Sequence, residues 1–144
     1  MQARVGDENE LCIKLPYDSV LNIPGYGEFE AKVEKYDKSA DIPKEPYTKW
    51  FDYDKISNGV FIRNRQSGDF ITLDPGGKRK KLKKFLIDEK IPLSERDDIV
   101  LLADGPHIIW IAGYRISSHY KVGEETERVL KVTFRPSEER LRDQ

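Results

Sequence analysis

The residues most suited to a specific chemistry are cations, because six of them fall within the seven positions from Lys78 to Lys84. Apolar residues recur at helical spacing beside them, which predicts a helix over residues 80–90 that opens on these cations. The predicted apolar face comprises Leu82, Phe85 and Leu86. Cations in a first helical turn oppose the helix dipole by roughly 0.3–1 kcal/mol each, and the sequence shows no local compensation. The pattern therefore indicates a polyanionic partner that supplies the negative charge.

A chain of phosphates fits these cations better than a single nucleotide does. Gly76 and Gly77 allow backbone N–H groups to face outward at the predicted helix start, where an anion binds well. The segment lacks the Ser or Thr of a nucleotide-binding P-loop, because Arg79 follows Lys78. Many separate cations suit many phosphates, and the helix lacks the broad apolar face of a membrane anchor. The alternative is that these cations form a solvent-exposed face of the helix that binds no partner.

Residues typical of catalysis are few and scattered. His107 falls in a predicted strand and His119 in a polar loop, and Cys12 is the only cysteine, so no spacing typical of a zinc site exists. Ser117 and Ser118 precede His119, but neighbours in sequence do not make a catalytic triad. We expect neither a metal site nor a catalytic residue in this chain.

The charges are unevenly distributed along a chain whose net charge is only −1. Residues 1–54 carry 7 Lys or Arg against 12 Asp or Glu, whereas residues 61–96 carry 10 against 5. The basic segment could therefore meet the acidic segment of a second copy, which leaves a protein-interaction or dimerisation module open as an alternative function. No apolar run approaches the roughly 20 residues that cross a bilayer, and the first residues do not show the basic-then-apolar pattern of a signal peptide. We expect a cytoplasmic protein without a membrane partner.

The elements that position these residues are predicted to be mostly short strands. Strands are expected over residues 11–15, 28–35, 60–65, 70–73, 99–103, 107–112 and 128–135. Pro24-Gly25 is expected to join the first two as a turn. The pattern of residues 50–56 is compatible with either a short helix or a strand. A turn of helix is expected over residues 93–97. With 144 residues, the chain reads as one strand-dominated α+β domain.

Five segments in order resemble the C-terminal domain of tRNA(Ile)-lysidine synthetase. They read IRNRQSGDFI, GGKRKKLKKFLIDEKIPLSERD, LLADG, IIWIAGYRIS and YKVGEETERVLKV. The resemblance implies a strand-rich layered α+β fold, an unusual β-sandwich with short helices like one in the phenylalanyl-tRNA synthetase β chain. It divides the chain into lead-in strands and a connector over residues 1–50, the tRNA-binding domain over residues 51–135 and a frayed tail over residues 136–144.

The resemblance also implies a function. The family's enzyme is an ATP-dependent ligase that attaches lysine to the wobble cytidine of isoleucine tRNA, and its C-terminal domain grips the acceptor stem. ATP and magnesium belong to an N-terminal catalytic domain, whose Ser-Gly-Gly-x-Asp-Ser loop is absent from this sequence. We therefore expect a fragment that docks tRNA, needs no cofactor itself and does not catalyse alone. Its implied partners are tRNA and that catalytic domain, with a homodimer left open.

The RNA-binding residues are assigned by combining the resemblance with the charge pattern. They are Arg63, Arg65, Lys78, Arg79, Lys80, Lys81, Lys83, Lys84 and Arg115. Phe70 stands where many relatives have an arginine, which removes one cation. Two alternatives stay open: Asp69 pairs internally with Arg63 or Arg65, and Arg115 is structural. We expect the cations to contact RNA phosphates without reading bases.

Overall fold

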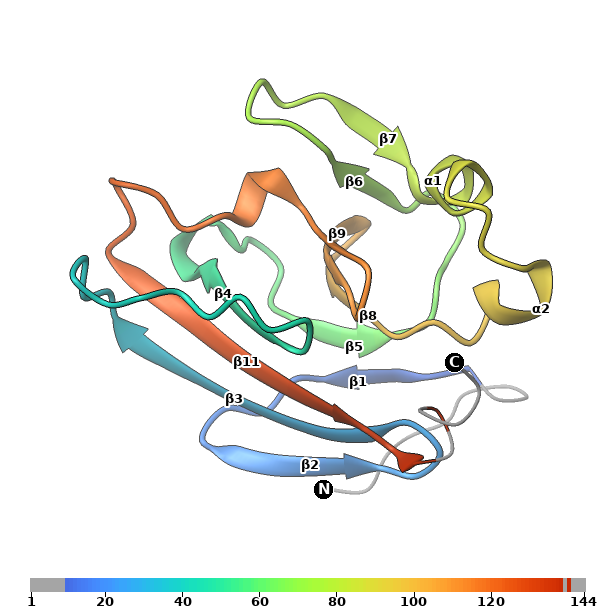
Figure 1. The fold of residues 1–144 in the computed structure, drawn as a ribbon, viewed down its shortest axis with the longest axis horizontal. Coiled ribbons are helices and arrows are strands. Elements are labelled where there is room, and N and C mark those ends of the chain that lie inside the picture. The colour runs from blue at the N-terminus through green and yellow to red at the C-terminus, as the bar shows by residue number, and fades with distance from the viewer. Residues whose placement is uncertain (1–9, 139, 141–144) are drawn as a thin grey trace.

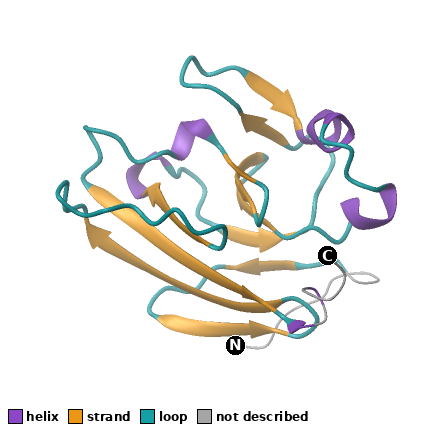
Figure 2. Cartoon of the chain, in the orientation of Figure 1, coloured by secondary structure: helices purple, strands orange, loops and turns teal. Residues whose placement is uncertain are grey.

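Two packed β-sheets with short helices on one side form the protein (Figure 1). The structure is a computed structural model that describes residues 10–138 and 140. The strands are β1 (Cys12–Lys14), β2 (Ser19–Ile23), β3 (Gly27–Lys35), β4 (Thr48–Asp52), β5 (Phe61–Arg63), β6 (Phe70–Thr72), β7 (Arg79–Lys81), β8 (Leu101–Asp104), β9 (His107–Ile111), β10 (Arg115–Ile116) and β11 (Arg128–Pro136). The helices are α1 (Leu82–Asp88) and α2 (Leu93–Arg96), with 3₁₀ turns η2 (Tyr53–Lys55) and η3 (Ser118–Tyr120). Strands dominate, as the strand-rich α+β prediction requires (Figure 2).

The larger sheet has seven strands and the smaller has four. The larger has the order β1-β5-β8-β9-β6-β7, with β10 added to β9, so β1 and β7 form opposite edges. The smaller has the order β2-β3-β11-β4, and its pairs are antiparallel. One pair in the larger sheet is parallel, where Phe70 of β6 faces His107 of β9. This pairing brings the β6–β7 hairpin beside the start of β9.

Two hydrophobic cores lie on the two faces of the larger sheet. The first fills the space between the sheets, where Trp110 is buried and the rings of Phe29 and Phe134 stack at 4.4 Å. The second lies between the larger sheet and α1, around Ile71 and Phe85. Burial of apolar area at about 25 cal/mol per Å² makes these cores the main source of stability.

A β-bulge in β9 places two successive side chains of this strand in the same core. Leu102 faces Trp110 and Ala103 faces Ile108, so Ile109 has no partner on β8. Ile109 and Trp110 consequently both lie in the first core, whereas Ile108 lies in the second. The carbonyl of Ile109 accepts a hydrogen bond of 2.9 Å from the N–H of Ser117, which fixes the start of η3.

Most strand predictions are confirmed, but one pairing is not. β3 buries Phe29 and Ala31 on the predicted face, and β8 and β9 form the predicted hairpin. The expected hairpin between residues 11–15 and 28–35 is wrong, since β1 pairs with β5 and the hairpin partner of β3 is β2. Residues 50–56 contain the end of β4 and then η2.

Residues on both sides of position 50 build the same sheets. β1 pairs with β5, and β3 pairs with β11, so residues 10–50 share their core with the later strands. The expected frayed tail falls mostly outside the described residues. Of its described part, Ser137 donates its N–H to the carbonyl of Tyr26, and Arg140 donates to that of Gly25. No helix among the described residues is long and apolar enough to span a membrane.

Candidate nucleic-acid interface

The basic segment is divided between an edge strand and a helix. The prediction that a helix begins near its first cations is wrong, because β7 occupies Arg79–Lys81 and α1 begins at Leu82. β7 pairs with β6 so that Arg79 faces Thr72 and Lys81 faces Phe70. Side chains opposite each other in a sheet share a face. Arg79, Lys81 and Phe70 therefore lie on one face of the hairpin, and the Arg79 guanidinium lies 4.4 Å from the centroid of the Phe70 ring.

Lys80 points to the other face of the hairpin and is paired. It lies opposite the buried Ile71, and its ammonium forms an ion pair with Asp88 at the end of α1. This hydrogen bond lowers the pKa of Asp88 below its usual value. The expectation that the chain supplies no local compensation is therefore wrong for Lys80, whose positive charge is already matched by Asp88.

Helix α1 presents Lys83 and Lys84 to solvent, where both side chains are exposed. Its predicted apolar face is confirmed, because Leu82, Phe85 and Leu86 are buried against the second core. No acidic residue lies in the first turn of this helix. The cations of α1 thus continue the exposed cations of β7.

The glycine turn does not form the expected anion site. Gly77 donates its N–H to the carbonyl of Asp74 at 3.1 Å, and the N–H of Lys78 donates to the carboxylate of Asp74 at 3.0 Å. These bonds close the β6–β7 hairpin, so the N–H groups are used within the turn. A strand follows this turn, not the helix of a P-loop, and the described residues contain no group of three His, Cys, Asp or Glu that could hold a metal.

Arg63 is a buried structural residue, which removes it from the candidate RNA-binding set. Its side chain is 5% exposed and makes two hydrogen bonds to the carboxylate of Asp69, at 2.7 and 2.9 Å. The guanidinium also donates to the carbonyls of Asn64 and Gly105. The internal pairing of Asp69 with Arg63 is thereby confirmed. A charge held this way cannot reach a phosphate without breaking a buried ion pair.

The last two assigned arginines lie in different surroundings. Arg65 donates to Asp97 at 2.7 Å, so an acid already accompanies it. Arg115 is exposed at the start of β10 and donates to the carbonyl of Leu73 at 3.2 Å. That bond places Arg115 beside the β6–β7 hairpin.

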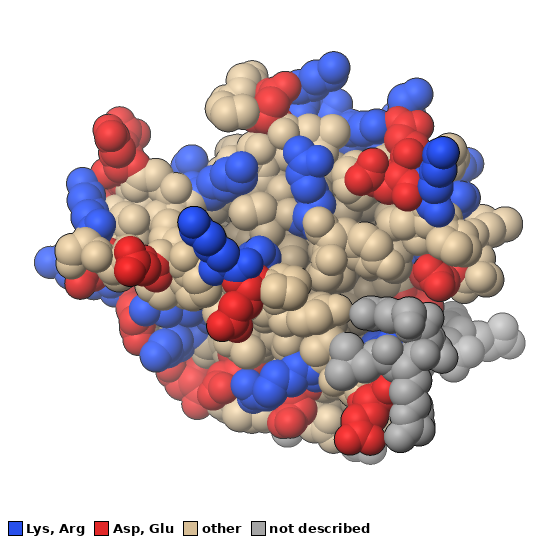
Figure 3. Space-filling model, viewed as in Figure 1, with Lys and Arg blue, Asp and Glu red and all other residues tan. Residues whose placement is uncertain are grey.

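Six of the assigned cations remain exposed on the β6–β7 hairpin, α1 and the start of β10, and we call this set the basic surface. It comprises Lys78, Arg79, Lys81, Lys83, Lys84 and Arg115. Within the described part of the chain, no acid forms an ion pair with any of the six. Figure 3 shows Lys and Arg side chains projecting from the end of the molecule where Figure 1 places β7 and α1. Such unpaired cations raise the local potential for an anionic ligand.

Several acids of residues 1–54 are matched by cations of β11 and its neighbours. Lys131 pairs with Glu34 at 2.8 Å, Arg135 pairs with Glu30 at 3.3 Å, and Arg128 pairs with Asp54. These ion pairs are intramolecular and join segments far apart in sequence. The acidic segment is therefore less available to a second copy than its net charge suggests.

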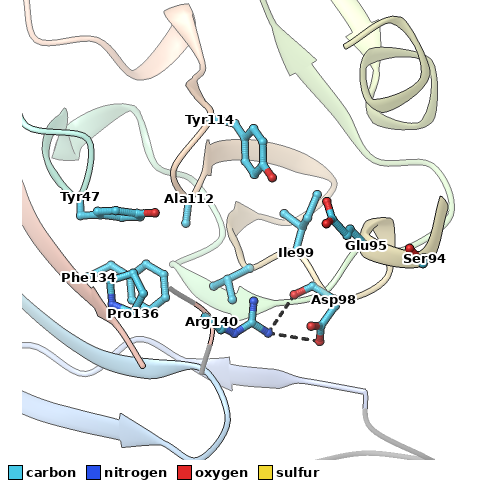
Figure 4. A pocket seen from close by; sticks show the side chains of 11 residues that line it. Tyr47, Ser94, Glu95, Asp98, Ile99, Ala112, Tyr114, Phe134, Pro136 and Arg140 are labelled. Carbon is cyan, nitrogen blue, oxygen red and sulfur yellow. Dashed lines mark hydrogen bonds and ion pairs between the residues drawn. The ribbon is translucent and has the colours of Figure 1, made fainter. Parts of the chain in front are cut away.

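A cleft of about 320 Å³ lies elsewhere, between α2, the residues that follow β9 and the end of β11 (Figure 4). Its walls include Tyr47, Tyr114 and the acids Glu95 and Asp98, and Arg140 pairs with Asp98 at 3.1 Å. The two carboxylates repel phosphate, so this cleft does not extend the basic surface.

The structure also brings together rings that sequence analysis left apart. The Phe70 ring lies 4.5 Å from that of His107, which lies 4.9 Å from that of His119. His107 is half-buried, and its Nε2 lies 2.9 Å from the Thr72 hydroxyl. Burial, with the nearby His119 and Arg79, lowers the pKa of His107 to about 4. The parallel pairing of β6 with β9 brings Phe70 beside His107, and no local sequence pattern reveals it.

Two packed sheets with an unpaired cationic edge define a strand-rich α+β domain, and comparisons with known proteins refine this class. A family model described as the TilS substrate C-terminal domain matches residues 60–134. The tRNA(Ile)-lysidine synthase of Caldanaerobacter subterraneus subsp. tengcongensis is 43% identical over 129 residues, covering 84% of this chain and 27% of that protein. The enzyme of the same name from Clostridioides difficile is 35% identical over 131 residues, covering 90% of this chain and 28% of that protein.

A solved structure described as the crystal structure of the TilS C-terminal domain shares the fold. It superposes with a TM-score of 0.70 at 24% identity, covering 88% of this chain and 97% of that one. The chain belongs to the family of tRNA(Ile)-lysidine synthase C-terminal domains, which confirms the resemblance found in the sequence. It spans little more than a quarter of the length of the two relatives.

Proposed function

We propose that this chain is the tRNA-docking domain of a tRNA(Ile)-lysidine synthase and that its basic surface contacts the phosphates of the acceptor stem. The observation that carries the proposal is that six exposed cations lie on the β6–β7 hairpin, α1 and the start of β10, and none of them forms an ion pair in the described structure. The other assigned cations, Arg63, Arg65 and Lys80, each have an acid of this chain as partner. RNA phosphates would supply the missing negative charge.

The geometry of the surface suits backbone contacts better than base reading. Double-stranded RNA has a deep, narrow major groove that side chains do not read, so proteins bind its phosphates and shape. Lys81, Lys83 and Lys84 lie where β7 meets α1, and their long flexible side chains can contact a phosphate backbone without specifying sequence. Selection of the isoleucine tRNA would then come from the rest of the enzyme.

In the whole enzyme, the catalytic domain would form the bond between lysine and the wobble cytidine. ATP and magnesium would bind there, as the resemblance to the family implies. This domain would hold the tRNA body, in the cytoplasm where tRNA is modified, and would have no catalytic residue of its own. Its contribution would be affinity and orientation of the tRNA.

Binding of isoleucine tRNA and of an acceptor-stem minihelix over a salt series tests this proposal. Contacts with about four to six phosphates predict a log–log salt slope of roughly −3 to −5. The triple variant Lys81→Ala, Lys83→Ala, Lys84→Ala should weaken binding at least tenfold at low salt and reduce the slope by roughly 2 to 3.

A matched variant controls for the loss of three charges. Lys14, Lys35 and Lys38 are also exposed, and Lys14 lies on β1 at the edge of the sheet opposite β7. Changing these three to Ala should alter affinity less than threefold. Equal losses in the two triple variants would show that net charge, and not the basic surface, attracts the RNA. Circular dichroism spectra should show that both variants fold.

A further inference from the structure

A row of four planar groups begins within the basic surface and ends outside it. The Arg79 guanidinium covers Phe70, Phe70 contacts His107, and His107 stacks on His119 with an angle of 29° between the rings. Successive centres are 4.4, 4.5 and 4.9 Å apart. These spacings are typical of stacked or tilted aromatic contacts. The row thus extends from a cation of the basic surface, Arg79, to the imidazole ring of His119.

The inner members of the row are held in place by packing and hydrogen bonds. The backbone of Phe70 is fixed by its pairing with Lys81 on one side and His107 on the other. The Nε2 atom of His107 contacts the hydroxyl of Thr72 at 2.9 Å and that of Ser117 at 3.4 Å. A ring held in this way loses little conformational entropy when a ligand stacks on the row.

The outer end of the row is available to a ligand. His119 is exposed, and its other ring neighbour, Tyr120, is buried and meets it edge-on, with an angle of 87° between the rings. The backbone of His119 is fixed in η3, where its N–H lies 3.4 Å from the Ser117 hydroxyl. Protein surfaces that bind single-stranded nucleic acid combine a basic track with such ordered rings.

We propose that this row is a stacking platform for an unpaired nucleotide of an RNA whose duplex lies on the basic surface, with His119 as the residue that contacts the base. The inference deepens the proposed function and depends on it. Stacking is tolerant of base identity, because every base has a π face. The platform would therefore recognise a single-stranded end of the RNA by its lack of pairing, and not by its sequence.

Three stem-loop RNAs with one common stem test the platform. One stem is blunt, one carries four unpaired nucleotides at its 3′ end, and one carries four abasic nucleotides there, which keep the phosphates but lack bases. The wild-type chain should bind the RNA with unpaired bases about tenfold more tightly than the abasic one, as expected for stacking of one base. Fluorescence of 2-aminopurine in the overhang should fall on binding.

Two variants at one position separate stacking from other roles. His119→Ala should lose most of the tenfold preference while its affinity for the blunt stem stays within about twofold. His119→Phe should keep the preference, because the ring is retained. Equal affinity of the wild type for the base-containing and abasic overhangs, or an equal loss with all three RNAs in His119→Ala, would overturn the platform.

The outcome for the platform is distinguishable from that for the basic surface. Loss of blunt-stem binding in the Lys81, Lys83 and Lys84 triple variant supports the basic surface whatever His119 does. Failure of the wild type to bind any of the three RNAs at low salt would overturn both proposals.

Discussion

Two groups of cations that lie within about twenty residues of each other have opposite surroundings. Arg63 is buried, with Asp69 and two carbonyls as hydrogen-bond partners, whereas Lys81, Lys83 and Lys84 are exposed without an acidic partner. A buried charge must be paired to be tolerated, whereas an exposed charge is solvated by water and can bind an external anion. The sign and number of charges in a segment therefore do not define an interface. The pairing of each charge does.

The largest effect is expected when the buried pair is broken. Arg63→Ala leaves the Asp69 carboxylate buried without its guanidinium, which should cost about 3–5 kcal/mol in the free energy of unfolding. Urea denaturation measures this loss. The double variant Arg63→Met, Asp69→Leu should lose less than Arg63→Ala, because it leaves no uncompensated charge. A loss below about 1 kcal/mol in Arg63→Ala would contradict a structural role for this arginine.

His107 is half-buried, unlike the buried Arg63 and the exposed lysines, and its lowered pKa predicts that the stability of the fold depends on pH. The unfolded chain takes up a proton near the usual value of 6.5, but the folded chain does so only near 4. Between these values the unfolded state binds more protons, so the free energy of unfolding falls as the pH falls. After allowance for partial exposure, the loss should be on the order of 1–2 kcal/mol.

His107→Gln provides the reference for this titration, because other groups also lose stability in acid. The variant lacks the imidazole, so the stability advantage of the wild type over it should shrink between pH 6.5 and pH 4. Unfolding curves in urea at several pH values measure both proteins. A constant difference across this range would show that His107 is protonated equally in the folded and unfolded states.

A smaller effect is expected when an exposed pair is opened. Asp88→Asn removes the partner of Lys80 and adds this cation to those available for RNA. Affinity for tRNA should rise roughly two- to fivefold, and the salt slope should steepen by up to about 0.9. Stability should change little, since exposed ion pairs contribute little. Unchanged affinity in a salt titration would indicate that Lys80 points away from the RNA.

The smallest effect on stability and on affinity is expected at Arg65. This residue carries a positive charge but lies outside the basic surface, so its substitution tests whether the position of a charge matters. Its partner Asp97 is largely exposed, so Arg65→Ala should cost less than about 1 kcal/mol in unfolding free energy. Affinity for tRNA should change less than twofold, measured beside the Lys81, Lys83 and Lys84 triple variant. A loss of tenfold or more would extend the RNA contact to the strand-turn segment after β5.

Much of the fold could be predicted from the sequence because alternation and turns mark it. Phe29, Ala31 and Val33 alternate with charged residues along β3, and Asp104-Gly105 joins two apolar strands. The apolar face of α1 was also predicted correctly. β7 was missed because three successive cations show no alternation between apolar and polar residues, and its strand character depends on pairing with β6.

The candidate site was less accessible to sequence analysis because the partner of each residue is set by the fold and not by a local pattern. The bond between Arg63 and Asp69 spans six positions, and the sequence leaves Arg65 equally placed as a partner. The contact between Phe70 and His107 spans 37 positions and depends on a parallel strand pairing. Unlike a hairpin, this pairing has no turn sequence that would predict it. Phe70 was read as the loss of a cation, yet it lies beneath the guanidinium of Arg79.

The bulge at Ile109 determines which face of the sheet each side chain in the middle of β9 points to. One extra residue shifts the alternation of the strand, so that Trp110 reaches the core between the sheets while Ile108 reaches the core under α1. The same residue holds the N–H of Ser117 and with it the turn that carries His119. A deletion of Ile109 would restore regular alternation, with Ile108 and Trp110 still on opposite faces, but it would remove the residue whose carbonyl accepts from Ser117. The extra residue therefore serves to place a second large side chain in the core between the sheets and to anchor the turn before His119.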